Sequence, residues 1–548
     1  MGRSPRCVRL GRASIPWGMR AACVVVLLVG ASAALADNGG GPGWGMIGND
    51  SVDSRNQPFE RTIDPSNVSR LAPRWVAATA GDVSATPAVV HGAVYFPDWG
   101  GMLWKLDAQT GEVVWSHKVS DYTGVPGDIS RSSPVLAGNT LVIGDLSTSG
   151  TPPHVLGIDA KTGDLRWITA IDPDPHAIMT GSPVLAGDTV YIGTSQSGVS
   201  TYPGALVALD AQTGRLLWRS FSLPNPSGLP GGYWGAVMFG PPAVDVRDGL
   251  VFGSFKVAQG EPPAVAACNA AAPHGFSESC EQSGSYLSSV VAFDLKTGTP
   301  VWSYRVLGDT AWQRACGSQP AAVTWCAAES DQPLNGGDKW DLGGSGPNVF
   351  QIGRGSHKEM VVGVGEKSGV YVVLDAKTGA FVWNTLLGPG GDQGGMEWGT
   401  AYDGNRIYVS ITNQHHISYK LTEDGTLTNT TATGGSWAAL DPATGKILWQ
   451  TADPGTETLA GSTVGVWDLA PVSVANGVVY AASMAKGGKQ FYALDAATGS
   501  ILWSYSAGSS VNSGPAIVDG TVYWGSGYAR SAEGSGNKKL FAFSLGGQ

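Results

Sequence analysis

The sequence predicts an all-β protein, an eight-bladed β-propeller with a tryptophan repeat in its blades and a ring closed by strands from both ends of the chain. Two observations lead to this fold class. A motif that runs from an Asp through a Thr-Gly turn to a Trp occurs seven times, and the Asp and Trp are always eight positions apart. An eighth unit at the C-terminal end lacks one strand, and the N-terminal end offers a spare one.

Each copy of the motif reads as two antiparallel strands joined by a turn. In Leu209–Trp218, the chain turns at Thr213-Gly214 and resumes as a strand that ends in Trp. Gly supplies the positive φ that the turn needs, and the side chain of Asp210 can accept hydrogen bonds from the turn backbone. The seven copies are Leu106–Trp115, Ile158–Trp167, Leu209–Trp218, Phe293–Trp302, Leu374–Trp383, Leu440–Trp449 and Leu494–Trp503.

A second pattern precedes the motif and supplies the front half of each unit. A small residue and Pro start a short strand, which is followed by a turn and an apolar strand, as in Thr86–Val89 and Ala93–Phe96. Ser133–Val135 and Ser182–Val184 begin the next two units in the same way. Four short strands in each unit are typical of a propeller blade.

The last unit favours a closed ring over an open solenoid or a sandwich. It has its front strands at Pro515–Val518 and Thr521–Trp524 and a third strand at Leu540–Phe543, but no outer strand. Leu71–Trp75 ends in Trp and lies outside the other units, so we expect it to complete this blade. Closure would also hide the sheet edges.

Residues 1–36 are predicted to be a secretory signal peptide. Five Arg residues precede or flank the apolar run Ala21–Gly30, and Ala34-Leu35-Ala36 is a small-x-small cleavage site. The apolar run is too short for a membrane anchor. We therefore expect residues 37–548 to form a single propeller domain, in the periplasm or secreted, with no membrane anchor.

Composition argues against a nucleic-acid partner. Only 14% of residues are charged, and the formal net charge of −10 becomes −15 when the five Arg of the signal peptide are removed. A net negative charge disfavours nucleic acids and anionic membranes.

Four Cys residues remain after removal of the signal peptide. Cys268, Cys280, Cys316 and Cys326 form two local pairs in sequence, so disulfides 268–280 and 316–326 are the simplest pairing. Four Cys allow three connectivities. Zinc is the weaker interpretation because no typical ligand spacing accompanies them, and no Cys-x-x-Cys-His motif for covalent haem occurs.

The connections between Trp218 and Trp449 are longer than the others, and long loops on one face of a propeller are where a functional site is expected. They include Asp338 and Asp341 on either side of Lys339-Trp340. A carboxylate beside an aromatic ring in a partly dry cavity has a raised pKa and can act as a general base. Taken alone, solvated loop charges are the simpler interpretation of this segment.

The repeats, together with Asp82–Val89, Lys367–Asp375 and Pro471–Tyr480, resemble the polyvinyl alcohol dehydrogenase group of pyrroloquinoline quinone (PQQ) alcohol dehydrogenases. The resemblance extends roughly from Trp44 to Leu545. It implies a cofactor site near the propeller axis that holds PQQ and a calcium ion. The Trp repeat alone is less specific, since scaffold propellers share it.

The resemblance also assigns roles to individual residues. It implies that Asp341 is the base that takes the alcohol proton and is a metal ligand, and that Lys367 contacts the quinone oxygens. It implies that Arg131 pairs with a carboxylate of PQQ and that the hydroxyls of Thr180 and Ser195 bind the cofactor. These residue types suit a tricarboxylate quinone, which needs cationic and hydroxyl donors.

The resemblance implies one further cofactor contact and also shows three differences from the family pattern. Trp467 matches another cofactor contact. A Trp usually lies under the PQQ ring, but this chain has Val237–Gly240, so Phe239 or Met238 must stack instead. Lys256 stands in the segment that usually provides a calcium ligand, and no carboxylate occurs between Gly193 and Tyr202, where relatives place a Glu ligand.

Two functions follow from these observations. The first is an exported quinoprotein that oxidises an alcohol, secondary or polymeric as in polyvinyl alcohol, by hydride transfer to PQQ and passes the electrons to an external acceptor such as a soluble cytochrome. The second is a propeller with a degenerate metal site that serves as a binding scaffold or runs another reaction in the same cavity. The substituted calcium ligands favour the second, because hard cations need several oxygen donors. Asp341 and Lys367 favour the first.

Overall fold

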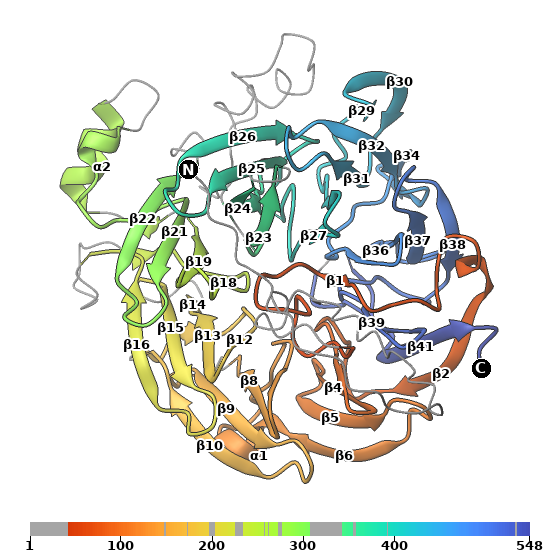
Figure 1. Cartoon of the computed structure of the whole chain (residues 1–548), viewed down its shortest axis with the longest axis horizontal. Helices are drawn as coiled ribbons and strands as arrows, with labels where there is room; N and C mark the ends of the chain where they lie inside the picture. Colours follow the sequence, from red (N-terminus) through yellow and green to blue (C-terminus); the bar gives the residue numbers. More distant parts are fainter. Residues whose placement is uncertain are drawn as a thin grey trace, which may run out of the picture. The chain divides into compact units, whose positions relative to one another are not determined.

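The computed structural model describes residues 42–146, 150–172, 174–196, 203–224, 234–256, 258–260, 262–271, 277–306, 342, 344–353, 358–391, 393–531 and 534–548. All of them belong to the compact unit Ala36–Gln548. Eight antiparallel four-stranded sheets succeed one another around a central axis, so the predicted eight-bladed propeller is confirmed (Figure 1).

Each blade runs from a short inner strand at the axis to an outer strand at the rim. Blades 1 to 4 consist of β3 (Ala88–Val90), β4 (Ala93–Pro97), β5 (Met102–Asp107) and β6 (Val113–Lys118); β7 (Val135–Ala137), β8 (Thr140–Gly144), β9 (His154–Asp159) and β10 (Leu165–Ala170); β12 (Val184–Ala186), β13 (Thr189–Gly193), β15 (Ala205–Asp210) and β16 (Leu216–Phe221); β18 (Ala243–Asp245), β19 (Leu250–Phe255), β21 (Ser289–Asp294) and β22 (Pro300–Arg305). Blades 5 to 8 consist of β23 (Asn348–Ile352), β24 (Glu359–Gly365), β25 (Val370–Asp375) and β26 (Phe381–Leu386); β27 (Ala401–Tyr402), β28 (Ile407–Ile411), β31 (Ser436–Leu440) and β32 (Ile447–Ala452); β35 (Ser473–Ala475), β36 (Val478–Ala482), β37 (Phe491–Asp495) and β38 (Ile501–Tyr505); β39 (Ala516–Val518), β40 (Thr521–Ser526), β41 (Lys539–Leu545) and β2 (Leu71–Ala78).

The remaining elements are short and lie in connections between strands. Cys268 in α2 and Cys280 in η3 form one of the two predicted disulfides, whereas Cys316 and Cys326 lie outside the described residues. Among the helices that the structure describes, none is long and apolar enough to cross a membrane. The short elements in the connections are β1 (Asn56–Gln57), β11 (Ala177–Ile178), β14 (Ser195–Gln196), β17 (Trp234–Gly235), β20 (Ala258–Gly260), β29 (Tyr419–Glu423), β30 (Thr426–Ala432), β33 (Thr456–Leu459), β34 (Ser462–Gly465), α1 (Val119–Thr123), α2 (Pro263–Ala271), η1 (Val68–Arg70) and η3 (Glu278–Cys280).

The repeat tryptophans join neighbouring blades. The ring of Trp449, for example, packs on Gly499 in the turn of the next blade, where a Cβ would clash with it, and its indole N–H donates to the carbonyl of Ala496 at 3.1 Å. Buried indole N–H groups need such acceptors. The equivalent bonds run from Trp115 to Ala160, Trp218 to Leu295, Trp302 to Ala376, Trp383 to Pro442 and Trp503 to Leu71.

The ring closes as the sequence predicts. Strand β2 from the N-terminal side pairs with β41 from the C-terminal end, with Trp75 opposite Ala542 (Figure 1). Trp75 then packs on Gly111 of blade 1 and donates to the carbonyl of Ala108 at 3.1 Å. The last blade therefore docks on the first with the same contact that joins the other blades.

A segment at the N-terminal side of β2 lines the axis and contacts the inner strands. We call Trp44–Gln57 the channel segment. In six blades, the second residue of the inner strand donates its backbone N–H to a carbonyl of this segment, and in blade 8 the Gln57 amide donates to the carbonyl of Ile517 at 3.2 Å. Met46 packs in the core cluster that contains Val184 of blade 3. The six bonds are Val89 to Trp44, Leu136 to Gly45, Val244 to Ser51, Val349 to Val52, Tyr402 to Ser54 and Val474 to Arg55, at 2.7–3.1 Å.

Arg55 links two parts of the channel segment to the residues that precede the inner strands of blades 1 and 7. Its guanidinium is fully buried and donates to the carbonyls of Val472 and Ile47 and to the hydroxyl of Thr86, at 2.9, 3.1 and 3.2 Å. Burial lowers the pKa of Arg55 to about 10, and the neighbouring Asp53 carboxylate opposes that shift. A buried cation with several acceptors stabilises the fold only while its partners remain in place.

A pair of buried carboxyl groups lies between blades 6 and 7. Asp453 is 6% exposed and Asp468 is fully buried. Burial raises the pKa of both groups, and the charge of Asp453 raises that of Asp468 further. The folded state therefore favours a protonated Asp468.

Replacing Arg55 should destabilise the propeller strongly. Arg55→Met leaves three buried acceptors unpaired and a buried Asp53 without its nearby cation, so we expect a loss of about 3–5 kcal/mol in the free energy of unfolding. Chemical denaturation measures this loss. Arg61→Met is the matched control, because Arg61 belongs to the same part of the chain but is exposed, and it should change stability by less than about 0.5 kcal/mol. Equal effects of the two substitutions would contradict the role of Arg55.

Replacing Asp468 should make stability less sensitive to pH. A carboxyl with a raised native pKa stabilises the fold below its unfolded pKa, and this contribution is lost as pH rises through the native pKa. Asp468→Asn does not titrate, so its free energy of unfolding should improve relative to wild type as the pH is raised from about 4 to about 8. Denaturation across this range measures the difference. With the exposed Asp188→Asn as control, the difference from wild type should be nearly constant.

Candidate functional site

A cavity at the axis collects side chains from seven blades. Ile47 of the channel segment also lines it, and the other lining residues come directly before the inner strands. Blade 5 alone contributes none of the lining residues that the structure describes. The lining from the blades consists of Ser84, Thr86, Arg131, Ser133, Thr180, Ser182, Phe239, Pro241, Trp398, Pro471 and Asn512.

The lining follows the repeat of the fold. Ser84, Arg131, Thr180, Phe239 and Asn512 each stand four residues before the first residue of an inner strand, so the propeller symmetry brings them to one level. Thr, Ser and Pro side chains two residues nearer the strands, together with Trp398 and Ile47, complete the wall. The backbone N–H of Thr86 donates to the Ser133 hydroxyl and that of Ser133 to the Ser182 hydroxyl, both at 2.9 Å.

Arg131 is the cation that lines the cavity. Its guanidinium carbon lies 4.3 Å from the ring centre of Trp398 and 5.5 Å from that of Trp99. Trp99 donates its indole N–H to the hydroxyl of Ser84 at 2.9 Å. Two aromatic rings therefore hold the guanidinium, and its N–H groups suit a carboxylate ligand.

The two predicted hydroxyls lie together. Thr180 Oγ1 and Ser195 Oγ are 2.6 Å apart, and Ser195 also donates to the carbonyl of Met238 at 3.1 Å. Only Thr180 of the two lines the cavity. The short pairing of Ile178 in β11 with Ser195 in β14 brings them into contact.

Phe239, rather than Met238, faces the cavity. Met238 is fully buried in a core cluster, whereas Phe239 belongs to the lining. The alternation of neighbouring residues explains this choice, because consecutive residues of an extended chain point to opposite sides. Phe239 therefore supplies one flat apolar surface and Trp398 a second.

Lys256 lies behind Phe239. Its ammonium is 4.7 Å from the centre of the Phe239 ring, and the residue is 8% exposed. Within the described ranges, no group of three or more His, Cys, Asp or Glu side chains could hold a metal ion. The described residues therefore do not fit calcium, because the segment predicted to carry a ligand presents an ammonium group to this region.

Lys367 follows β24 and forms an ion pair with a residue that sequence reasoning did not select. Its Nζ is 3.7 Å from Oε1 of Glu397, and both side chains are almost completely buried. Glu397 also accepts a hydrogen bond at Oε2 from the backbone N–H of Gly344 at 2.7 Å. The pair lies next to the cavity because Trp398 follows Glu397 in the chain.

Trp467 lies in the packing behind the cavity wall. It is 1% exposed and belongs to a cluster with Met484 and Tyr528, against which Trp99 and Trp398 pack. It is absent from the lining of the cavity. The structure therefore brings it to the site only through Trp398 and Trp99.

Asp341, the predicted base and metal ligand, lies outside the described residues, as does Asp338. Its role stays a prediction. Of the other predicted site residues, Arg131, Thr180 and Phe239 line one cavity, and Ser195, Lys256 and Trp467 lie one contact behind its wall. Lys367 contacts Glu397, which precedes the lining residue Trp398 in the chain.

Sequence reasoning missed Ser84, Glu397, Trp398 and Asn512. Asn512 is 2% exposed, and neither polar atom of its amide has a hydrogen-bond partner. A buried amide needs partners, so an unpaired one in a cavity wall points to a polar ligand. Counting four residues back from each inner strand, as for Arg131 and Thr180, would have selected Ser84, Glu397 and Asn512.

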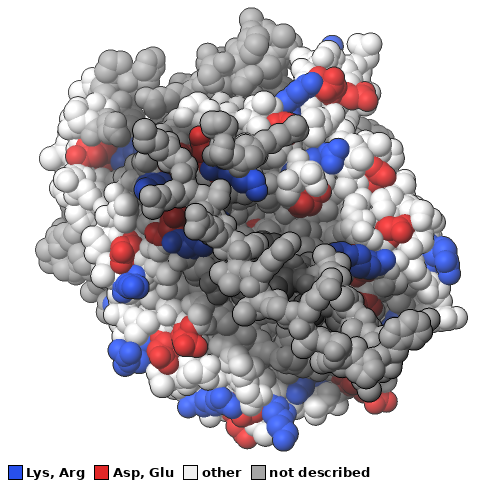
Figure 2. Space-filling model, in the orientation of Figure 1, with Lys and Arg blue, Asp and Glu red and all other residues white. Residues whose placement is uncertain are grey.

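The cavity has a different electrostatic character from the visible surface. In Figure 2, basic and acidic side chains are interspersed over the face shown, without an extended patch of one sign.

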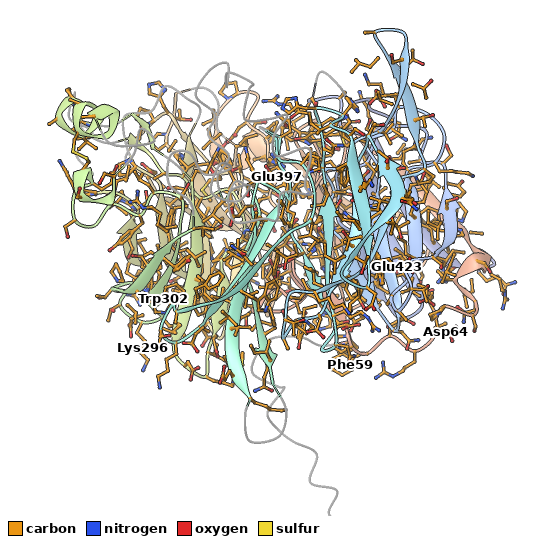
Figure 3. All side chains as sticks on the ribbon, turned by 90° about the horizontal axis from the view of Figure 1, so that it is seen from above. Phe59, Asp64, Lys296, Trp302, Glu397 and Glu423 are labelled. Atoms are coloured by element: carbon orange, nitrogen blue, oxygen red, sulfur yellow. A yellow bond between two sulfur atoms is a disulfide. The ribbon has the colours of Figure 1, made fainter. Side chains whose placement is uncertain are left out.

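In the side view of Figure 3, Glu397 lies towards one face of the propeller, and Phe59, Asp64 and Lys296 lie towards the other. The residues that follow the channel segment therefore leave on the face opposite Glu397.

The residues present fit a flat polyanion such as PQQ. Phe239 and Trp398 offer planar surfaces, Arg131 offers a guanidinium, and Asn512 offers an unpaired amide. Hydroxyl groups of the lining add further donors. This set matches the needs of carboxylate and quinone oxygens in a site shielded from water.

Comparisons with known proteins agree with this fold. A family model described as outer membrane protein assembly factor BamB matches residues 71–234 and 433–544. A second, described as the beta-propeller domain of glucose/ethanol/alcohol dehydrogenase, matches residues 174–334.

Several of the similar proteins are alcohol dehydrogenases. A polyvinylalcohol dehydrogenase of Sphingopyxis sp. (strain 113P3) is 27% identical, over 89% of this chain and 74% of the relative. One from Pseudomonas sp. is 26% identical, over 92% and 77%. The crystal structure of quinohemoprotein alcohol dehydrogenase from Comamonas testosteroni superposes with a TM-score of 0.67 at 20% identity, over 94% of this chain and 82% of that one.

The first family model spans just over half of the chain, and the second covers most of the region that separates its two matches. The chain therefore belongs to this family of PQQ-repeat propellers and is a homologue of the polyvinyl alcohol and quinoprotein alcohol dehydrogenases.

Proposed function

We propose that this protein is a PQQ-dependent alcohol dehydrogenase. The observation that supports it most is the cavity in which Arg131, Thr180 and Phe239 meet beside an unpaired buried Asn512 amide. PQQ, when bound there, accepts a hydride from an alcohol and later gives up two electrons. The homologues support the same class of reaction.

Each described residue of the site would have its own role in holding the cofactor. Arg131 would pair with a carboxylate, the Thr180 hydroxyl, which contacts Ser195 behind it, would meet a cofactor oxygen, and Phe239 would stack on the ring. Lys367 places a positive charge where a quinone oxygen becomes negative, which stabilises the transition state in a dry site. Asp341 takes the hydroxyl proton of the substrate at its carboxylate.

The substrate and the place of action extend the proposal. The polyvinylalcohol dehydrogenases among the relatives favour a secondary or polymeric alcohol. The Arg-flanked apolar run before Ala36 favours export to the periplasm or the medium. An external one-electron carrier, such as a soluble cytochrome, would then collect the electrons.

A second function is supported by two specific observations. One family model carries the description of an outer membrane assembly factor, and Lys256 occupies the segment predicted to hold a calcium ligand. A scaffold propeller would use the surface of the ring and bind no PQQ. A PQQ titration of the purified wild-type protein, followed by the quenching of tryptophan fluorescence, decides between the two functions.

Asp341→Asn should abolish most of the activity and leave cofactor binding intact. Asn keeps the shape and hydrogen-bonding capacity of Asp but cannot accept the proton, so alcohol-dependent dye reduction should fall by about 10²–10⁴-fold while the Kd for PQQ changes little. Asp338→Asn is the matched control and should retain activity. Lys367→Ala should also slow the reaction, and Lys367→Arg should restore part of it by returning the charge. Full activity of Asp341→Asn would remove Asp341 from the mechanism.

Calcium should affect this protein less than its relatives. Lys256 provides a fixed cation near Phe239, so protein treated with a chelator should still bind PQQ and should gain little activity from added calcium. A polyvinyl alcohol dehydrogenase treated in parallel provides the comparison. Complete loss of activity with chelator and recovery with calcium alone would show that residues outside the described ranges complete a full ligand set.

A further inference from the structure

Two consecutive residues in the connection from blade 5 to blade 6 contact two cations from different blades. Glu397 Oε1 is 3.7 Å from Nζ of Lys367, and the ring of Trp398 is 4.3 Å from the guanidinium carbon of Arg131. We propose that Glu397 and Trp398 are positioning residues that fix both cations of the cofactor site. The inference rests on the proposed function, because that function gives Lys367 and Arg131 their roles.

The position of Glu397 is built into the backbone around it. The Gly344 N–H donates to Oε2 at 2.7 Å, and a Cβ at either Gly344 or Gly394 would clash with the Glu397 side chain. Gly394 also has φ of 105°, which favours glycine. The carboxylate is 8% exposed and so is shielded from competing water. An ion pair in such a position has a defined geometry that a surface pair lacks.

The same connection holds the backbone of Lys367. The N–H groups of Gly391 and Gly395 donate to the Lys367 carbonyl at 3.0 and 2.8 Å, and Met396 donates to the carbonyl of Glu366 at 3.0 Å. Both ends of the lysine are therefore held by one loop. Its ammonium cannot move far from the cavity wall without breaking contacts at Glu397.

Trp398 adopts a backbone conformation that bulky residues rarely take. Its φ is 62°, in the left-handed region, and it lines the cavity. The Gly399 N–H donates to the carbonyl of Glu397 at 2.9 Å, and Gly399 lies so close to Arg55 that a Cβ there would come within 2.9 Å of the arginine side chain. Strained residues that surrounding contacts hold in place often occur at functional sites.

The strained conformation places the indole where it can orient Arg131. The ring centre of Trp99 lies 5.5 Å from the guanidinium carbon, and the indole of Trp99 donates to the hydroxyl of Ser84. The Trp398 indole N–H is buried and has no hydrogen-bond partner, so it is also available to a ligand in the cavity. Arg131 is thus oriented before a carboxylate arrives, which reduces the entropic cost of binding.

The first experiment uses the protein without PQQ. Lys367 is labelled with acetic anhydride and Arg131 with phenylglyoxal, and the rates are read by mass spectrometry of the peptides. Glu397→Gln should speed the labelling of Lys367 by about 10-fold, because a buried charge-assisted contact is lost. Trp398→Leu should speed the labelling of Arg131 by about 3- to 30-fold. The exposed Lys296 and Arg61 are internal references and should react at unchanged rates.

The second experiment uses PQQ-loaded protein and separates the two residues. Glu397→Gln should lower kcat by up to about 10²-fold through displacement of Lys367, with little change in the Kd for PQQ or the KM for the alcohol. Trp398→Leu should weaken PQQ binding by about 3- to 30-fold. Glu397→Asp and Trp398→Phe keep the carboxylate and the ring, and each should recover most of the loss.

The outcomes keep this inference distinct from the proposed function. Unchanged labelling of Lys367 in Glu397→Gln, or of Arg131 in Trp398→Leu, overturns the positioning role of that residue, provided that thermal melting shows a folded variant. Equal kcat values for wild type and Glu397→Gln overturn it as well. Wild-type protein that binds no PQQ rejects the proposed function, and the labelling rates still decide whether Glu397 and Trp398 hold the two cations.

Discussion

The structure depends on how the inner edges of the blades are satisfied. An inner strand at the axis of a propeller has backbone N–H groups with no neighbouring strand of their own sheet, and unpaired buried N–H groups are costly. The channel segment accepts hydrogen bonds from the inner strands of six blades, and Gln57 donates to the seventh. One stretch of chain thus links almost every blade and forms part of the cavity floor through Ile47.

The same segment connects stability with the site. Arg55 reaches the hydroxyl of Thr86 in the cavity wall and packs against Gly399, which follows Trp398. A displacement of Arg55 would therefore also shift Gly399 and its neighbour Trp398, whose ring contacts Arg131. In this protein, the scaffold and the cavity wall share residues, so changes far from the cavity can alter the geometry of the cations.

A repeated fold produces an asymmetric site here by varying one position in each blade. The residue four places before the inner strand is a serine in blade 1, an arginine in blade 2, a threonine in blade 3, a phenylalanine in blade 4, a glutamate in blade 6 and an asparagine in blade 8. Each of these residues stands at the same distance in sequence from its inner strand, and the side chains differ. The fold therefore arranges a ring of positions, and the chemistry depends on which side chains occupy it.

The sequence determined the fold because its signals are local and repeated. The spacing of Asp and Trp, the Thr-Gly turns and the spare strand Leu71–Trp75 together favoured eight blades and a closed ring, which the pairing of β2 with β41 confirms. The sequence also pointed to Arg131, Thr180 and Phe239, which line one cavity.

Only the tertiary structure decided which residues stand behind those groups. The contacts of Lys367 with Glu397 and of Arg131 with Trp398 join residues from different blades, and the channel segment reaches six inner strands through backbone atoms, which leave no trace in residue identity. The sequence could not choose between Met238 and Phe239 either, because the direction of a side chain depends on the local course of the backbone at the axis. Such long-range packing is set when the ring closes, and no periodic pattern in the chain encodes it.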